Sequence, residues 1–211
     1  MKVCTDACLF GAWFARKNLH AKSILDIGSG TGLLMLMLAQ NHSSDFHGIE
    51  IDNFCFQQLK ENIGNSKWSD RIELTEGDVR HFFSEWKFDF IVSNPPFYEN
   101  SLTSPSAGAN LARHSSHLTL EELLASINRN LSPSGSFAIL LPYHRSEEFE
   151  SIVTKNDFYV VEKVAVRQSP RHNFFRCIYH CTRTQPEKIS EKITKNHHNQ
   201  YSYNNHHTLT G

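Results

Sequence analysis

The segment Ile24–Gly32 reads Ile-Leu-Asp-Ile-Gly-Ser-Gly-Thr-Gly. It leaves a strand, turns through Gly28, Gly30 and Gly32, and enters an apolar segment with helical spacing. Glycines let a backbone approach a ligand closely and present its amides at a helix N-terminus. The stretch therefore predicts a nucleotide-type cofactor bound at these three glycines.

Two residues indicate which cofactor this is. A dinucleotide-binding turn places its third glycine where this chain has Leu33. The carboxylate of Asp26, two residues before the turn, would repel a pyrophosphate but attract the ammonium group of a methionine moiety. S-adenosylmethionine therefore fits the turn better than NAD does.

Two further carboxylates follow at the ends of the next strands. Glu50 comes eighteen residues after Gly32 and is placed to accept hydrogen bonds from both ribose hydroxyls. Asp78 follows the third strand and is placed to accept from the cofactor's adenine amine, with Val79 supplying a backbone amide. Either carboxylate alone could be a surface cap, but their order along the chain favours a cofactor site.

Strand-like and helix-like segments alternate along most of the chain, which predicts an α/β fold with a mainly parallel sheet covered on both faces. The expected strands are Ser23–Gly28, Phe46–Ile51, Arg71–Thr75, Phe88–Ser93, Ser136–Leu141, Tyr159–Val166 and Phe175–Cys181. The expected helices are Thr31–Gln40, Asn53–Ile63, Thr119–Asn130 and Arg145–Asn156. The last two strands leave no room for a helix between them, so we expect them to pair antiparallel at one edge.

Two signals delimit one of these helices. Thr119 and Glu122 have the spacing of a capping box, and Pro133-Ser134-Gly135 is expected to stop the helix. Residues 1–185 are predicted to form one domain. Residues 186–211 are polar and rich in His and Asn, and we expect a flexible tail there.

Composition narrows the function classes. The 211 residues are 39% hydrophobic and 20% charged. The sequence has no apolar run of the roughly 18 residues that would span a bilayer, and its start does not resemble a signal peptide. We therefore expect a cytoplasmic protein without a membrane partner. Five scattered cysteines without a Cys-x-x-Cys pair predict neither disulfides nor a metal site. A net charge of -1 means that a nucleic-acid partner would need a local basic patch; a monomer is assumed.

The fourth expected strand runs into Asn94-Pro95-Pro96-Phe97-Tyr98. Ligands of open parallel sheets bind at the carboxyl ends of strands, so this turn should face the cofactor. The side-chain oxygen of Asn94 and the backbone carbonyl of Pro95 can accept the two hydrogens of a planar amine and direct its lone pair at a methyl group. Pro95 and Pro96 fix the backbone, and Phe97 offers a face on which a flipped base can stack.

The cofactor turn, the two later carboxylates and Asn94–Phe97 together resemble the class I methyltransferase fold over roughly residues 20 to 183. The resemblance implies a seven-stranded sheet in the order 3-2-1-4-5-7-6 with strand 7 antiparallel. It also implies an S-adenosylmethionine-dependent enzyme.

Three segments resemble the bacterial tRNA1(Val) (adenine-N6)-methyltransferases: Lys2–Trp13, Asn94–Phe97 and Ala112–His114. The family usually has Gly at the position of Cys4, and its members begin with a further segment ahead of Met1. The resemblance implies methylation of the adenosine 3′ of the anticodon of a valine tRNA. Thr5 could either cap the helix that runs to about Lys17 or close over the methionine end of the cofactor.

Basic residues outside the cofactor turn are candidate tRNA contacts. Arg113 and His114 follow the catalytic turn, and Tyr98 adjoins it. Arg171 belongs to the basic stretch between the last two strands, which could either be a solvated loop or hold tRNA phosphates.

The Asn-Pro-Pro motif indicates the reaction better than the substrate. Enzymes that methylate guanine N2 of rRNA, adenine N6 of DNA, or a glutamine amide of release factors share it, because each methylates a planar conjugated nitrogen. A catalytically silent binding subunit is the alternative of another class, although such a subunit would be expected to have lost the glycines or the Asn-Pro-Pro.

Overall fold

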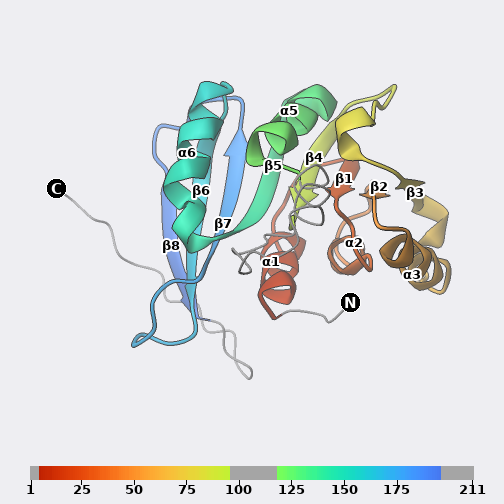
Figure 1. Ribbon diagram of the computed structural model, residues 1–211, viewed down its shortest axis with the longest axis horizontal. Coiled ribbons are helices and arrows are strands. Elements are labelled where there is room, and N and C mark those ends of the chain that lie inside the picture. Colours follow the sequence, from red (N-terminus) through yellow and green to blue (C-terminus); the bar gives the residue numbers. More distant parts are fainter. Residues whose placement is uncertain (1–4, 96–117, 196–211) are drawn as a thin grey trace, which may run out of the picture.

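A computed structural model of the protein describes residues 5–95 and 118–195, and its strands form one sheet in the order β3-β2-β1-β4-β5-β7-β6-β8 (Figure 1). The strands are β1 (Ser23–Ile27), β2 (Asp45–Glu50), β3 (Ile72–Glu76), β4 (Phe88–Ser93), β5 (Leu131–Pro142), β6 (Tyr159–Arg167), β7 (Arg176–Thr182) and β8 (Ser190–Lys195). β7 is antiparallel to β5 and β6, whereas the other neighbouring strands are parallel. The predicted order and the antiparallel seventh strand are confirmed.

Helices cover both faces of this sheet (Figure 1). They are α1 (Thr5–Ala15), α2 (Leu33–Ala39), α3 (Asn53–Gly64), α5 (Leu120–Asn130) and α6 (Ser146–Lys155), with short 3-10 turns η1 (Ser69–Arg71), η2 (Val79–His81) and η3 (Tyr143–Arg145). One hydrophobic core joins α1, α2 and α3 to one face, and a second joins α5 and α6 to the other. Over residues 5–95 and 118–195, no helix is both long and apolar enough to span a bilayer.

Local signals set the helix starts. The side chain of Thr119 accepts from the backbone N–H of Glu122, whose own carboxylate accepts from the N–H of Thr119, so the predicted capping box is confirmed. The carboxylate of Asp52 accepts from the N–H of Cys55 and begins α3 in the same manner. The remaining predicted boundaries mostly differ from the structure by one or two residues.

The predicted end of α5 at Asn130 is confirmed, although the expected stop signal Pro133-Ser134-Gly135 does not itself cap the helix. The helix ends at Asn130, and the tripeptide lies inside β5, where the register with β4 shifts between Phe88 and Phe90. The side chain of Asn130 holds this end of the helix, because it donates to the carbonyl of Ser126 and accepts from the N–H of Ser84. The chain therefore enters the strand four residues before the glycine.

An eighth strand lies in the segment for which the sequence predicted no regular structure. β8 pairs parallel with β6, from Glu162 opposite Ser190 to Arg167 opposite Lys195. Its side chains are mostly polar and exposed, so it lacks the apolar pattern from which the other strands were predicted. Backbone pairing and one ion pair, between Lys192 and Glu162 at 2.7 Å, hold it to the sheet.

Glu162 is a buried carboxylate that joins three elements. Its oxygens accept from the indole N–H of Trp13 at 2.9 Å and from the ammonium groups of Lys17 and Lys192, both at 2.7 Å. Burial alone would raise the pKa of Glu162, but the hydrogen bonds from Lys17, Lys192 and Trp13 outweigh it and lower the pKa below its ordinary value.

We expect Glu162→Ala to lower the free energy of unfolding by about 2 kcal/mol, the value of charge-assisted hydrogen bonds lost from a buried site. Glu148→Ala is the matched control, because Glu148 also pairs with a cation, Arg145, but with a side chain that is 46% exposed. Its loss should cost at most about 0.5 kcal/mol. Urea unfolding measures both, and equal losses would show that the buried network does not stabilise the fold.

Candidate active site

The pairing of β1 with β2 and β4 brings three predicted site segments to one edge of the sheet. Ile27 pairs with Ile49 on one side and with Ser93 on the other. The residues that follow are Gly28, Glu50 and Asn94, so they are neighbours at the carboxyl ends of the strands. The hydroxyl of Ser93 donates to the carbonyl of Ile27 at 2.9 Å, and the N–H of Gly28 donates to the carbonyl of Ile49 at 2.9 Å.

The three glycines of the turn all adopt left-handed backbone conformations, with φ of 71° at Gly28, 56° at Gly30 and 84° at Gly32. At Gly28, an added Cβ would meet no atom within 4 Å, so open space lies beside the backbone. At Gly32 it would lie 2.8 Å from Cδ1 of Leu59, so this glycine allows α2 to pack closely on α3. Only the first of these two positions therefore leaves room for a ligand.

Asp26 is a buried carboxyl group near the end of β1. It is 1% exposed, and neither carboxyl oxygen accepts a hydrogen bond from a described residue. Burial, with a smaller contribution from the Glu50 carboxylate, raises the pKa of Asp26 to about 8, while the backbone of Met35 acts in the opposite direction. A buried carboxyl group beside an open glycine turn fits the cationic end of an amino-acid moiety, as S-adenosylmethionine would present.

Glu50 is held by backbone amides of the same edge. It is 8% exposed, and its two oxygens accept from the N–H of Gly30 at 2.8 Å and from the N–H of Asp52 at 2.9 Å. A carboxylate has about four lone-pair sites, so two remain available for the hydroxyls of a ribose. The predicted role of Glu50 is compatible with this arrangement.

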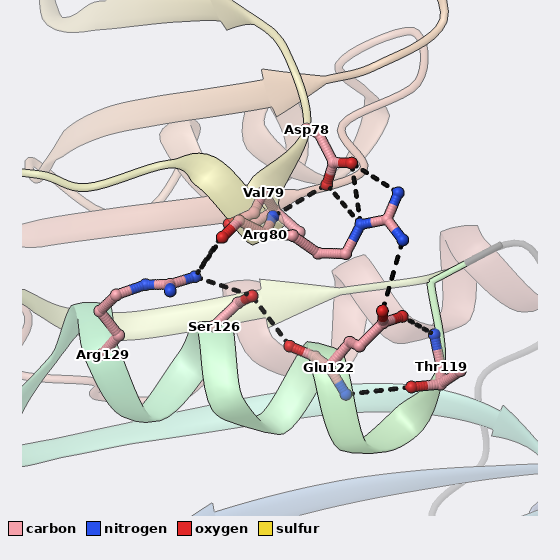
Figure 2. A network of polar contacts seen from close by, with 7 residues as sticks. All are labelled: Asp78, Val79, Arg80, Thr119, Glu122, Ser126 and Arg129. Carbon is pink, nitrogen blue, oxygen red and sulfur yellow. Dashed lines mark hydrogen bonds and ion pairs between the residues drawn. The ribbon is translucent and has the colours of Figure 1, made fainter. Parts of the chain in front are cut away.

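Asp78 lies in a polar network that the sequence did not predict (Figure 2). The guanidinium of Arg80 contacts both of its oxygens, with Nη2 at 2.6 Å and Nε at 2.8 Å from Oδ2 and Nε at 3.1 Å from Oδ1. These hydrogen bonds lower the pKa of Asp78 below its ordinary value, although burial opposes the shift. Asp78 is therefore ionised at neutral pH and can only accept hydrogen bonds. Val79, the neighbouring predicted residue, is buried.

Two of the expected catalytic residues are described. Asn94 is half-buried and Pro95 is buried, directly after the last residue of β4. The other predicted catalytic residues and three of the predicted substrate contacts lie outside the described residues. These are Pro96, Phe97, Tyr98, Arg113 and His114.

The remaining predicted site residues lie at the start of α1 and in the loop between β6 and β7. Thr5 begins α1 and is exposed, whereas the neighbouring Asp6 forms a 2.7 Å ion pair with Arg176 of β7. Arg171 is exposed in the loop, and only its backbone N–H has a hydrogen-bond partner, the hydroxyl of Ser169, among the described contacts. β6 is parallel to β5 through their common partner β7, so this loop lies at the carboxyl edge, as Asn94 does.

Arg80 was not predicted, because a basic residue two positions after an aspartate is too common to indicate a site. Its second partner, Glu122, was predicted only as a member of the capping box, and their contact is seen only in the structure. Among residues 5–95 and 118–195, no group of three His, Cys, Asp or Glu side chains is placed to hold a metal ion.

Known proteins resemble this chain in sequence and in fold. The family model described as methyltransferase small domain matches residues 9–162. A tRNA1(Val) (adenine(37)-N6)-methyltransferase from Dyadobacter fermentans is 39% identical over 88% of this chain and 77% of its own length. A protein of the same name from Shewanella putrefaciens is 34% identical over 96% of this chain and 87% of its own.

Two solved structures illustrate the likeness in fold. A predicted O-methyltransferase from Agrobacterium tumefaciens has a TM-score of 0.64 at 15% identity, over 90% of this chain and 84% of its own. A glycopeptide N-methyltransferase complexed with S-adenosyl-L-methionine has a TM-score of 0.61 at 12% identity, over 85% and 87%. The predicted class I methyltransferase fold is thereby confirmed.

We expect Asp26→Asn to separate stability from cofactor binding. The pKa of Asp26 rises from 3.8 to about 8 on folding, so the folded protein keeps a proton that the unfolded chain releases. The free energy of unfolding of the wild type should therefore fall as pH rises from 3.8 to about 8. Asp26→Asn lacks this titration, so the wild type should lose about 1 kcal/mol per pH unit more than the variant. The variant should also bind S-adenosylmethionine at least about tenfold more weakly, because it lacks the negative charge.

Urea unfolding between pH 6 and 8 and calorimetric titration with the cofactor measure these two effects. Asp89→Asn is the matched control, because Asp89 lies at the opposite edge and accepts from the amides of Lys22 and Ser23. It should lose stability and keep its affinity for the cofactor. An unchanged affinity in Asp26→Asn would contradict the assigned role.

Proposed function

Because this chain belongs to the family of tRNA1(Val) (adenine(37)-N6)-methyltransferases, which depend on S-adenosylmethionine, we propose that it methylates N6 of an adenine in tRNA. The proposed target is the adenosine 3′ of the anticodon of tRNA1(Val), in the cytoplasm. The proposal rests on the position of Asn94. Ser93 pairs with Ile27, and Asn94 follows Ser93 as Gly28 follows Ile27, so Asn94 lies beside the glycine turn.

Three carboxylates would hold the cofactor along this edge. Asp26 would pair with the ammonium group, Glu50 would accept from the ribose hydroxyls, and Asp78 would accept from the adenine amine. Each carboxylate lies at the end of a different strand or just beyond it, so the bound molecule would extend across β1, β2 and β3. When bound, S-adenosylmethionine supplies a methyl group on a positively charged sulfur.

Asn94 and Pro95 would act on the acceptor nitrogen. The exocyclic amine of adenine is a weak nucleophile because its lone pair is delocalised into the ring. The side-chain oxygen of Asn94 and the backbone carbonyl of Pro95 would each accept one amine hydrogen, which localises the lone pair and orients it toward the methyl group. Burial of Pro95 and the fixed φ of proline support a rigid placement of these acceptors.

The basic loop between β6 and β7 supplies a candidate contact for tRNA phosphates. The chain has a net charge of -1, so its overall field does not attract a polyanion, and binding depends on local basic groups. Arg171 is exposed at the edge that carries Asn94. Arg176 is a weaker candidate, because Asp6 already occupies its guanidinium.

Labelled methyl transfer tests the proposed reaction. We expect the wild type to transfer label from S-adenosylmethionine to unmodified total tRNA, and nucleoside analysis to recover it as N6-methyladenosine. Total rRNA, DNA and a release factor are offered in parallel reactions. Label found as N2-methylguanosine in rRNA, as methyladenine in DNA or as methylglutamine would refute the tRNA assignment.

Asn94→Ala extends this test to the mechanism. The variant should lose turnover by at least about a hundredfold, as expected for removal of a group that orients the reacting atom, while its dissociation constant for the cofactor changes little. Asn128→Ala is the matched control, because Asn128 is exposed near the end of α5 and binds Arg183 at the opposite edge. A loss of cofactor affinity in Asn94→Ala would place this residue in the wrong subsite.

Arg171→Gln should weaken tRNA binding without changing the affinity for the cofactor. Removal of one phosphate contact reduces the slope of log affinity against log salt by about 1. Filter binding over a series of salt concentrations measures this slope. Lys155→Gln removes an equal charge from the exposed end of α6, at the opposite edge, and should leave the slope unchanged. If both variants keep the wild-type slope, the loop does not contact tRNA.

A further inference from the structure

Arg80 donates hydrogen bonds to both oxygens of the Asp78 carboxylate. Its backbone N–H donates to Oδ1 at 2.9 Å, its Nη2 donates to Oδ2, and its Nε is shared between the two oxygens. Three N–H groups of a single residue thus bind one carboxylate. These groups make four contacts, two on each oxygen, and the Asp78 side chain is still 19% exposed, so a further donor can reach it.

Arg80 is itself anchored to α5 (Figure 2). Its Nη1 lies 3.3 Å from the carboxylate of Glu122, which also accepts from the N–H of Thr119 in the capping box. From the same helix, Nη2 of Arg129 donates to the carbonyls of Val79 and Arg80 at 3.2 Å and 3.0 Å. The 3-10 turn η2 that carries Asp78 at its start is therefore tied to α5 at both its side chains and its backbone.

Stability alone does not account for this arrangement. The side chains of Arg80 and Asp78 are 26% and 19% exposed, so the pair contributes to stability but also keeps access to the solvent, from which a ligand would approach. What the fork does provide is orientation, because planar guanidinium–carboxylate pairs fix the plane of the carboxylate. An ionised and fixed carboxylate that remains partly exposed favours a ligand that offers an N–H group.

We propose that Arg80 is a positioning residue that holds Asp78 so that the cofactor site selects an adenine, with its exocyclic amine, over a purine that has a carbonyl at that position. The inference rests on the cofactor part of the proposed function and not on the tRNA. Asp78 makes the contact, and Arg80 acts through it by holding the carboxylate in one plane. A carbonyl oxygen in place of the amine would face an acceptor that has no hydrogen to donate.

Calorimetric titration of the full chain, without RNA, tests the inference with two probes. These are S-adenosylhomocysteine and its deaminated form, S-inosylhomocysteine. We expect the wild type to bind the first probe at least about tenfold more tightly, the value of one charge-assisted hydrogen bond. Arg80→Gln should lose most of this preference, mainly through weaker binding of the adenine form.

Three further variants separate positioning from structure. Arg80→Lys keeps the charge but not the fork and should restore part of the preference. Glu122→Gln keeps a capping box while removing the charge that anchors Arg80, so its loss should be smaller than that of Arg80→Gln. Arg183→Gln is the matched control, because Arg183 also binds α5, through Asn128, but at the opposite edge of the sheet.

The outcomes distinguish the possibilities. The inference is supported if Arg80→Gln loses the preference for S-adenosylhomocysteine over S-inosylhomocysteine. Arg183→Gln should keep both this preference and the wild-type melting temperature. Equal weakening of both probes in Arg80→Gln would show a structural role only and would overturn it, as would an unchanged preference. Because no nucleic acid is present, these results hold even if the methyl acceptor is not tRNA.

Discussion

Parallel pairing of β1 with β2 on one side and β4 on the other is the constraint on which the site depends. Parallel strands place their carboxyl ends at one edge, and the shared partner Ile27 aligns the ends of β2 and β4 to within one residue. Gly28, Glu50 and Asn94 become neighbours although 66 residues separate the first from the last. A shift of one residue in either register would turn Asp26 and its neighbours to the opposite faces.

The same edge explains the contrast between the three acidic side chains. Glu50 and Asp78 have hydrogen-bond partners within the protein, which orient them before a ligand arrives. Asp26 has none among the described residues and is buried, so its ionised form is costly in the free protein. A cationic ligand would remove this cost, which couples binding to the loss of a proton. Hydrogen bonds within the protein thus orient Glu50 and Asp78, whereas Asp26 would interact with a ligand through its charge.

The strands and helices were predicted from the sequence because apolar runs and the capping box are local signals. The strand order followed from resemblance to a known fold and was confirmed. β8 was missed because its stability comes from backbone pairing and from Lys192 on Glu162, neither of which leaves an apolar pattern. The end of α5 at Asn130 was predicted correctly, but the side-chain hydrogen bond from Asn130 to the carbonyl of Ser126 was visible only in the structure.

The candidate site divides in the same way. Asp26, the glycines, Glu50 and Asn94 were predicted because each stands at a strand end, where position in the sequence determines position in space. Arg80 was not predicted, because its contact with α5 is made to Glu122, which is 42 residues away in the sequence. Side chains that bind a ligand can follow from a motif, whereas side chains that orient them depend on contacts between elements. This difference explains why a role for Asp78 was predicted from the sequence, whereas the contact of Arg80 with it was seen only in the structure.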